Sequence, residues 1–439
     1  MVREGIAFLI NKLKNSEMIK VFTYTSMSTV IKILTSFISI KVISNILGPS
    51  GIALIGQLNN FSSILMSFAS LGINQGITRY VSENRYSSEN LRKIIGTAFK
   101  LTFGTSVFLG LLLVLASSFF SRAILFKENY TYVFVIFGLL IVFYALNNLI
   151  LSVLNGLQEY KRYVQINILN SITGLAFTVG LVYVWELKGA LISLISYQSM
   201  MFFISLIMIR KDFWLKYLRI DGVNFDIGLV KKYFNYTIMT LTSAILIPST
   251  SIVLRRMVTK KISLDYAGYW ESMNKMSSMY LMIITMSLSV YFLPKLSQLT
   301  KKEEIRSAIK NIYRFIVPFL IIFFAIIYFT RSWIVQILFN EKFVFVEKLF
   351  FWQLLGDFFK MISWVLAFNM IAKSMTKTYV ISELIASALL LVLSVFLIKI
   401  NGVIGLTQAY FVNYLFYMIM MIFIFRKIIF NYGNSLDEK

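Results

Sequence analysis

Hydrophobic residues gather in long runs along nearly the whole chain, and short clusters of charge, Gly or Pro interrupt them. An apolar run of about twenty residues is long enough to cross the hydrocarbon core of a bilayer as an α-helix. The pattern predicts twelve such helices. Their expected ranges are 18–47, 51–80, 94–118, 131–156, 163–185, 189–210, 230–255, 265–294, 306–329, 344–372, 378–399 and 403–425.

The composition supports this class of fold. Hydrophobic residues make up 58% of the 439 positions, more apolar surface than a soluble core of this size absorbs. We therefore predict an all-α, polytopic membrane protein without a separate soluble domain. The sequence contains neither Cys nor His, which excludes disulfides, thiol nucleophiles and imidazole-based metal sites or proton relays. We expect no metal and no cofactor.

The distribution of charge predicts the orientation in the membrane. The formal net charge is +23, which in a soluble protein would suggest nucleic acid. Here the N-terminus, the even-numbered loops and the C-terminus hold 28 of the 43 Lys and Arg residues, and the odd-numbered loops hold 12. Because positive charge favours the cytoplasmic side, we expect both termini in the cytoplasm and no nucleic-acid partner. The helical spacing of apolar residues in 1–17 favours a short helix on the cytoplasmic interface.

The chain contains an internal repeat. A shift of 215 residues lays "ALIGQLNNFSSI" (53–64) on "GYWESMNKMSSM" (268–279), and a shift of 216 aligns "KRYV" (161–164) with "KTYV" (377–380). Six helices per repeat would place both halves in the same direction, with a pseudo-two-fold axis along the membrane normal. The predicted organisation is an interfacial helix (1–17), two six-helix halves (18–210 and 230–427), a cytoplasmic linker between them (211–229) and a cytoplasmic tail (428–439).

A polar stripe occurs in the second helix and again in the eighth. In the second helix its members recur at spacings of three and four and so share one helix face. They are Asn60, Ser63, Ser67, Ser70 and Asn74, and the equivalent positions in the eighth helix are Lys275, Ser278, Met282, Thr285 and Ser289. Ser and Asn often join membrane helices to one another. A stripe of this length that is repeated in both halves better fits the wall of a water-filled cavity.

Charged residues at membrane depth point to the same cavity, because such residues usually face a cavity or a partner. Lys32, Lys275 and Lys360 fall inside predicted helices, as does Asp357. Asp357 could neutralise Lys360, and Glu271 could neutralise Lys275, at their helical spacings of three and four. Near the outer ends of helices, Lys41, Arg255 and Arg256 could extend to the interface. Basic residues remain in excess, so we expect an anionic substrate.

Three segments give the chain a family resemblance: "LGPSGIALIGQLNNF" (47–61), "NGLQEYKRYVQINILNSITG" (155–174) and "AGYWESMNKMSSMYLMIITMSLSVYFLPKLS" (267–297). With the two six-helix halves, they resemble the polysaccharide-transporter branch of the multidrug/oligosaccharidyl-lipid/polysaccharide exporters. The similarity is strongest to Wzx-type flippases for O-antigen and enterobacterial common antigen. It covers essentially the whole chain.

The resemblance implies a function. Such flippases move an undecaprenyl-diphosphate-linked oligosaccharide from the cytoplasmic to the periplasmic leaflet of the bacterial inner membrane, by alternating access through a cationic cavity between two halves. It also implies membrane lipid as a partner, and a glycan polymerase and a chain-length regulator as further partners. Candidate diphosphate ligands are Lys32, Lys41, Arg255, Arg256 and Lys275. Candidate residues of the glycan-facing lumen are Asn59, Asn60, Ser63, Ser67, Asn74, Trp270, Asn274, Ser278 and Thr285. Candidate ion-coupling residues are Glu271, Asp357 and Glu383.

Two alternative functions compete with this interpretation. A drug/cation antiporter of the same superfamily would be expected to carry carboxylates deep in the N-terminal half, where this chain offers none well inside the membrane. A membrane-embedded glycan polymerase or another enzyme would need catalytic groups in a sizeable loop. The sequence shows no catalytic or nucleotide-binding motif of that kind, so we expect no enzyme.

Overall fold

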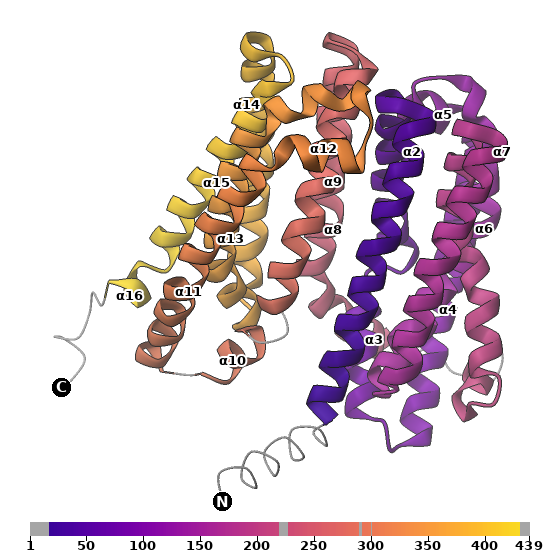
Figure 1. Ribbon diagram of the computed structural model, residues 1–439. Coiled ribbons are helices and arrows are strands. Elements are labelled where there is room, and N and C mark those ends of the chain that lie inside the picture. Colours follow the sequence, from indigo (N-terminus) through magenta and orange to yellow (C-terminus); the bar gives the residue numbers. More distant parts are fainter. Residues whose placement is uncertain (1–16, 219–226, 289–291, 300, 431–439) are drawn as a thin grey trace, which may run out of the picture. The chain divides into compact units, whose positions relative to one another are not determined.

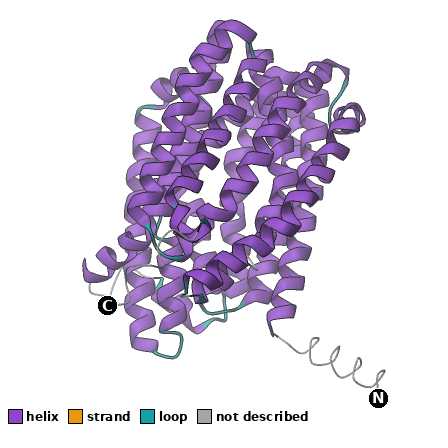
Figure 2. Ribbon diagram, turned by 90° about the vertical axis from the view of Figure 1, so that its left-hand side faces the viewer, coloured by secondary structure: helices purple, strands orange, loops and turns teal. Residues whose placement is uncertain are grey.

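The computed structural model describes residues 17–218, 227–288, 292–299 and 301–430, and in these ranges it contains helices and short connections but no strand (Figures 1 and 2). Within them, nine segments are long and apolar enough to cross a membrane. Two of the nine, Tyr24–Ala69 and Tyr160–Ile209, are pairs of helices that continue across a break in the backbone. One more long helix is α9 (Leu264–Ser287). The predicted all-α membrane fold is confirmed, and these elements are consistent with twelve helices.

The described chain divides into two compact units. The first comprises the chain up to Ile46 together with Phe61–Leu241. Its helices are the greater part of α2 (Glu17–Ala69), then α3 (Asn74–Glu83), α4 (Ser88–Leu115), α5 (Ser117–Leu125), η1 (Glu128–Tyr130), α6 (Thr131–Gly156), α7 (Tyr160–Ile209) and η2 (Phe213–Tyr217). The start of α4 is capped by Ser87, whose side chain accepts a hydrogen bond from the Asn90 backbone N–H.

Close packing of α4 against α6 holds the first unit together. A Cβ on Gly110 would lie 2.4 Å from the carbonyl oxygen of Gly138, so the two backbones touch where neither residue has a side chain. Small residues permit this approach between membrane helices, where dispersion contacts replace the hydrophobic effect as the driving force. Nearer one end, Ile95, Val153 and Trp214 belong to a buried apolar cluster.

The second unit comprises Leu47–Asn60 and the chain from Thr242 onward. Its helices are part of α8 (Ile227–Lys261), then α9, α10 (Leu293–Gln298), α11 (Lys302–Phe329), α12 (Arg331–Leu338), η4 (Glu341–Leu349), α13 (Phe350–Ala372), α14 (Thr376–Asn401), α15 (Ile404–Ile424) and α16 (Arg426–Ile429). The α13 helix packs on α15, where Gly356 faces the ring of Tyr410. Leu47–Asn60 comes from the predicted N-terminal half but packs with the C-terminal one. The predicted boundaries at 210 and 230 stay a prediction, and residues 1–16 and 431–439 lie outside the described ranges.

The second predicted helix, 51–80, is not continuous. The α2 helix ends at Ala69 and α3 begins at Asn74, because Leu71 and Gly72 adopt positive φ angles of 48° and 62°. Such angles end a helix, and Gly tolerates them best. The hydroxyl of Thr105 on α4 donates to the freed carbonyl of Ala69 at 2.6 Å. The predicted helix 265–294 divides likewise into α9, which ends at Ser287, and α10, which starts at Leu293.

The internal repeat reappears as matching local conformations inside each unit. Glu186 (φ 46°, ψ −124°) and Gly402 (φ 58°, ψ −139°) are 216 residues apart and form the same sharp turn between two helices. Just after each turn a glycine lies against a carbonyl of the preceding helix: Gly189 against Leu181 and Gly405 against Leu397. These pairs are also 216 residues apart. The shift found in the sequence is therefore the shift of the structure.

Candidate functional site

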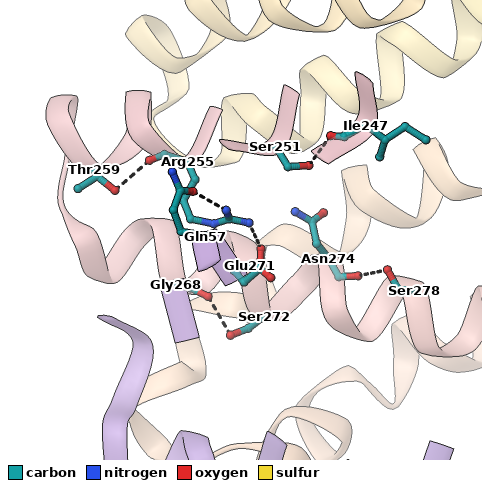
Figure 3. Close-up of polar contacts among 10 residues, drawn as sticks. All are labelled: Gln57, Ile247, Ser251, Arg255, Thr259, Gly268, Glu271, Ser272, Asn274 and Ser278. Carbon is teal, nitrogen blue, oxygen red and sulfur yellow. Dashed lines mark hydrogen bonds and ion pairs between the residues drawn. The ribbon is translucent and has the colours of Figure 1, made fainter. Parts of the chain in front are cut away.

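The most buried charge in the second unit is the guanidinium of Arg255 on α8, whose side chain is 0% exposed. Its Nη1 donates to Oε1 of Gln57 at 2.6 Å, and its Nη2 forms an ion pair with Oε2 of Glu271 (Figure 3). The guanidinium carbon lies 5.8 Å from the ring centroid of Trp270. The planar guanidinium can serve two acceptors at once, and an aromatic face adds cation–π attraction. Three elements therefore meet at one buried cation.

Two glycines bring these elements close enough for the contact. A Cβ on Gly56 would lie 2.3 Å from Oε1 of Glu271, and a Cβ on Gly268 would lie 2.0 Å from the carbonyl oxygen of Pro49. Beyond the glycines, the hydroxyl of Ser50 donates to the carboxylate of Asp265. The early part of the second helix and the start of α9 thus pack backbone to backbone.

The polar stripes are partly exposed. In the second helix, Asn59 and Ser63 are exposed, and Asn60, Ser67 and Asn74 are half-buried. In α9, Ser278 is exposed, and Asn274, Lys275 and Thr285 are half-buried. Several hydroxyls bond back to their own helix: Ser67 donates to the Ser63 carbonyl at 2.9 Å and Ser278 to the Asn274 carbonyl at 2.8 Å (Figure 3). Such bonds let a hydroxyl lie on an apolar helix, while the amides keep donors and acceptors available.

The candidate diphosphate ligands have different surroundings. Lys32 is exposed and Lys41 is half-buried, and both belong to the first unit. In the second unit Arg256 is exposed and Lys275 is half-buried, whereas the neighbouring Arg255 is fully buried. The ion pair of Glu271 is made with Arg255 and not with Lys275 four residues on, as the helical spacing had suggested.

Asp357 on α13 occupies a second buried polar cluster. Its carboxylate accepts hydrogen bonds from the hydroxyls of Ser277 (2.8 and 2.9 Å), Tyr410 (2.8 Å) and Tyr280. The ammonium of Lys360 lies over aromatic rings, with Nζ 5.2 Å from the ring centroid of Trp364 and 5.4 Å from that of Tyr414. Hydroxyls therefore satisfy the aspartate and ring faces receive the lysine.

The third candidate for ion coupling is Glu383 on α14, which accepts a hydrogen bond from the Tyr417 hydroxyl at 2.9 Å. Within the described ranges, no group of three or more His, Cys, Asp or Glu residues is placed to hold a metal ion. The sites of Asp357 and Glu383 are therefore built from one carboxylate and several hydroxyls each.

Sequence reasoning missed some partners and could have found others. Tyr410, Tyr414 and Tyr417 recur at spacings of four and three, a detectable sign of a polar face on an otherwise apolar helix. Gln57 carries a similar sign, because it is an amide inside an apolar run. The link between Gln57 and Arg255 spans 198 residues, and no local pattern predicts such a pair.

These helices and buried charges define a multi-pass membrane protein with a transporter fold. A multidrug transporter of the MATE family in an inward-facing conformation is similar with a TM-score of 0.75 and 11% identity, over 94% of this chain and all of that one. The lipid II flippase MurJ in an inward closed conformation has a TM-score of 0.68 and 18% identity, over 94% of this chain and 90% of that one.

The family follows from the sequence itself. The model of the polysaccharide biosynthesis protein family matches residues 18–300, and the chain belongs to this family. It is 29% identical over 401 residues to the lipid III flippases of Escherichia coli K12 and Shigella flexneri, a match that covers 91% of this chain and 95% of each relative. The resemblance noted in the sequence is confirmed.

Proposed function

We propose that the chain is a flippase that moves an undecaprenyl-diphosphate-linked oligosaccharide from the cytoplasmic to the periplasmic leaflet. The observation that carries the proposal is the similarity, over 91% of the chain, to two proteins named lipid III flippase. In this proposal the chain is a transporter and not an enzyme.

The chemistry of the candidate residues supports an anionic, hydrated substrate. A diphosphate brings negative charge, and Lys and Arg bind phosphate oxygens through charge-assisted hydrogen bonds. Lys32, Lys41, Arg256 and Lys275 are at least partly accessible and would attract the headgroup. The amides and hydroxyls of the two stripes would replace water around the sugar hydroxyls, and the polyprenyl tail would stay in lipid. We propose the same role for Trp270 and for the candidate lumen residues of both stripes.

Ion coupling, if the cycle uses it, would involve Asp357 or Glu383. Both carboxylates contact hydroxyl donors, an environment that can accept a proton or a small cation. Glu271 is the weaker candidate of the three, because its carboxylate already neutralises Arg255.

We propose the bacterial inner membrane as the location, with both termini in the cytoplasm, as the positive charge of the even-numbered loops favours. A glycan polymerase and a chain-length regulator would then act on the product at the periplasmic face. The MATE-like fold also admits drug/cation antiport, but the similarity to that structure has 11% identity and concerns the fold alone.

Deletion of the gene in its own host tests the proposal. The lipid-linked glycan should accumulate on the cytoplasmic side and the surface glycan should be lost, provided that the host makes no redundant flippase. An unchanged surface glycan, or sensitivity to cationic drugs as the only defect, would contradict the proposal.

Variants test the diphosphate ligands in the same host. The double substitution Lys275→Ala with Arg256→Ala should abolish export while the protein is still inserted, because two phosphate-binding cations are removed. Lys399→Ala is the matched control, since Lys399 is an exposed cation outside the stripes. Full export by the double variant would remove these two residues from the mechanism.

A further inference from the structure

Two segments that the internal repeat makes equivalent touch each other inside the second unit. Ser50 hydrogen-bonds Asp265, 215 residues away, and Gly56 lies against Glu271, also 215 residues away. This separation is the shift that aligns the two halves in the sequence. Each residue therefore meets its own equivalent, as residues do at the centre of an interface between two identical subunits.

The contact is tight and largely apolar. Every residue from Gly51 to Leu58 is buried, and the backbone of Pro49 lies where a Cβ of Gly268 would be. At such a distance no room for water remains between the two backbones. The segment Leu47–Asn60 therefore seals one end of the second unit.

The polar contacts divide unequally over this seam. Arg255 and its ionic partner Glu271 both lie on the far side of it, on α8 and α9, and Gln57 alone reaches them from Leu47–Asn60. If the segment left, Arg255 would keep its counter-ion and lose only a neutral acceptor. An ion pair that bridged the seam would resist separation far more, because one buried charge would be left alone. The arrangement suits a contact that opens.

Opening would also uncover phosphate-binding groups. Arg255 is 0% exposed in the closed contact, so it cannot reach a substrate there. Its Nε and the Nε2 of Gln57 have no hydrogen-bond partner in the described part of the chain. Removal of Gln57 would free Nη1 beside that Nε, and two adjacent guanidinium N–H groups form the fork that binds phosphate oxygens.

We propose that Leu47–Asn60 is a releasable latch. While it is closed, Gln57 occupies Arg255 and the outer end is sealed. When it opens, Arg255 passes from Gln57 to the diphosphate. Gly48, at φ 65° and ψ −167° with no heavy atom within 4 Å of its Cβ position, provides the pivot at the start of the segment. This inference rests on the proposed flippase function.

The absence of native Cys makes a cross-linking test clean. Ser50→Cys with Asp265→Cys places two thiols where the native side chains form a hydrogen bond. Asn401→Cys with Gln408→Cys is the matched control, because these side chains bond at 2.6 Å within the second unit and away from the seam. Each pair is oxidised in the deletion host, and cross-linking, surface glycan and recovery after reduction are measured.

Oxidation of the Ser50/Asp265 pair should lower export by about ten-fold or more, because a carrier held in one of two states cannot complete a cycle. Reduction should restore export, and the control pair should export normally in both states. Normal export by the cross-linked protein, or no cross-link at all, would overturn the latch. If the Cys-free parent itself fails to export glycan, the proposed function fails instead.

Variants of Gln57 separate the latch from a merely structural contact. Gln57→Glu gives Arg255 a second carboxylate and should hold the latch closed, with faster cross-linking of the Ser50/Asp265 pair and slower export. Gln57→Leu removes the acceptor and should slow cross-linking. Inorganic diphosphate added to the purified Cys pair should also slow cross-linking, and less so when Arg255→Lys is present. Equal cross-linking rates in all of these samples would contradict the exchange of partners at Arg255.

Discussion

At the scale of single residues, Arg255 shows how a membrane protein keeps a charge in its interior. Burial of an ion is costly, and the cost is offset only where a counter-ion and further hydrogen bonds are in place. Glu271 provides the counter-charge and Gln57 a second acceptor. Lysine would offer a compact ammonium in place of the planar fork, so it could not serve both acceptors in the same way.

The pair should therefore behave as a unit in stability measurements. Arg255→Met and Glu271→Met should each lower the free energy of unfolding by about 3–5 kcal/mol, because each leaves the other charge buried alone. The double variant should recover most of that loss, since two apolar side chains replace the pair. Unfolding in detergent, followed by tryptophan fluorescence, measures all three.

Lys93→Met is the control, because Lys93 forms an exposed ion pair with Glu89 at the end of α4. It should leave the unfolding transition where it is. Additive losses in the double variant would show that Arg255 and Glu271 are stabilised by separate partners.

At the scale of elements, the turns between helices are constrained by backbone conformation. The tight turn at Glu186 and its equivalent at Gly402 both place a residue near φ 50° and ψ −130°. These angles suit the first central position of a type II′ turn, where Gly is strongly preferred. Glu186 is therefore strained and Gly402 is not.

Reciprocal substitutions should have effects of opposite sign. Gly402→Ala should lower the free energy of unfolding by about 1–2 kcal/mol, because an L-residue with a Cβ pays that penalty at positive φ. Glu186→Gly should raise it or leave it unchanged, since it relieves the same penalty. Thermal unfolding of both variants beside the parent tests the pair, and destabilisation by Glu186→Gly would show that its side chain makes an important contact.

The sequence predicts some elements closely and others poorly. The range 131–156 coincides with α6, and 403–425 is within one residue of α15 at each end, because long apolar runs with polar ends leave little freedom. The broken second helix was predicted as continuous, since its break at Leu71 and Gly72 depends on backbone angles and on a cap from Thr105. The short α12 was missed because it lies in a predicted loop.

For the candidate site, the stripe spacing predicted which residues share a helix face. It could not predict that Arg255 is buried while its neighbour Arg256 is exposed, because consecutive residues on a helix point in different directions and the packing partner decides which is covered. The partner here is Gln57, which lies 198 residues away.

At the scale of the whole molecule, the uneven distribution of Lys and Arg predicts the topology. With no native Cys, single Cys variants report the side of each loop. Asn129→Cys, exposed in the third loop, should react with a membrane-impermeant maleimide in intact spheroplasts. Ser88→Cys, exposed at the second loop, should react only after lysis. Labelling of both variants in intact spheroplasts, or the reverse pattern, would contradict cytoplasmic termini.

The meeting of equivalent residues has a consequence for the history of the chain. In a dimer of two identical halves, the same side chain would face itself at each central contact. Here Ser50 faces Asp265 and Gly56 faces Glu271, so one half supplies small residues and the other supplies the carboxylates. Two copies of the first half would leave a gap between glycines, and two copies of the second would set carboxylate against carboxylate. After duplication the halves became complementary, and neither can now be replaced by a copy of the other.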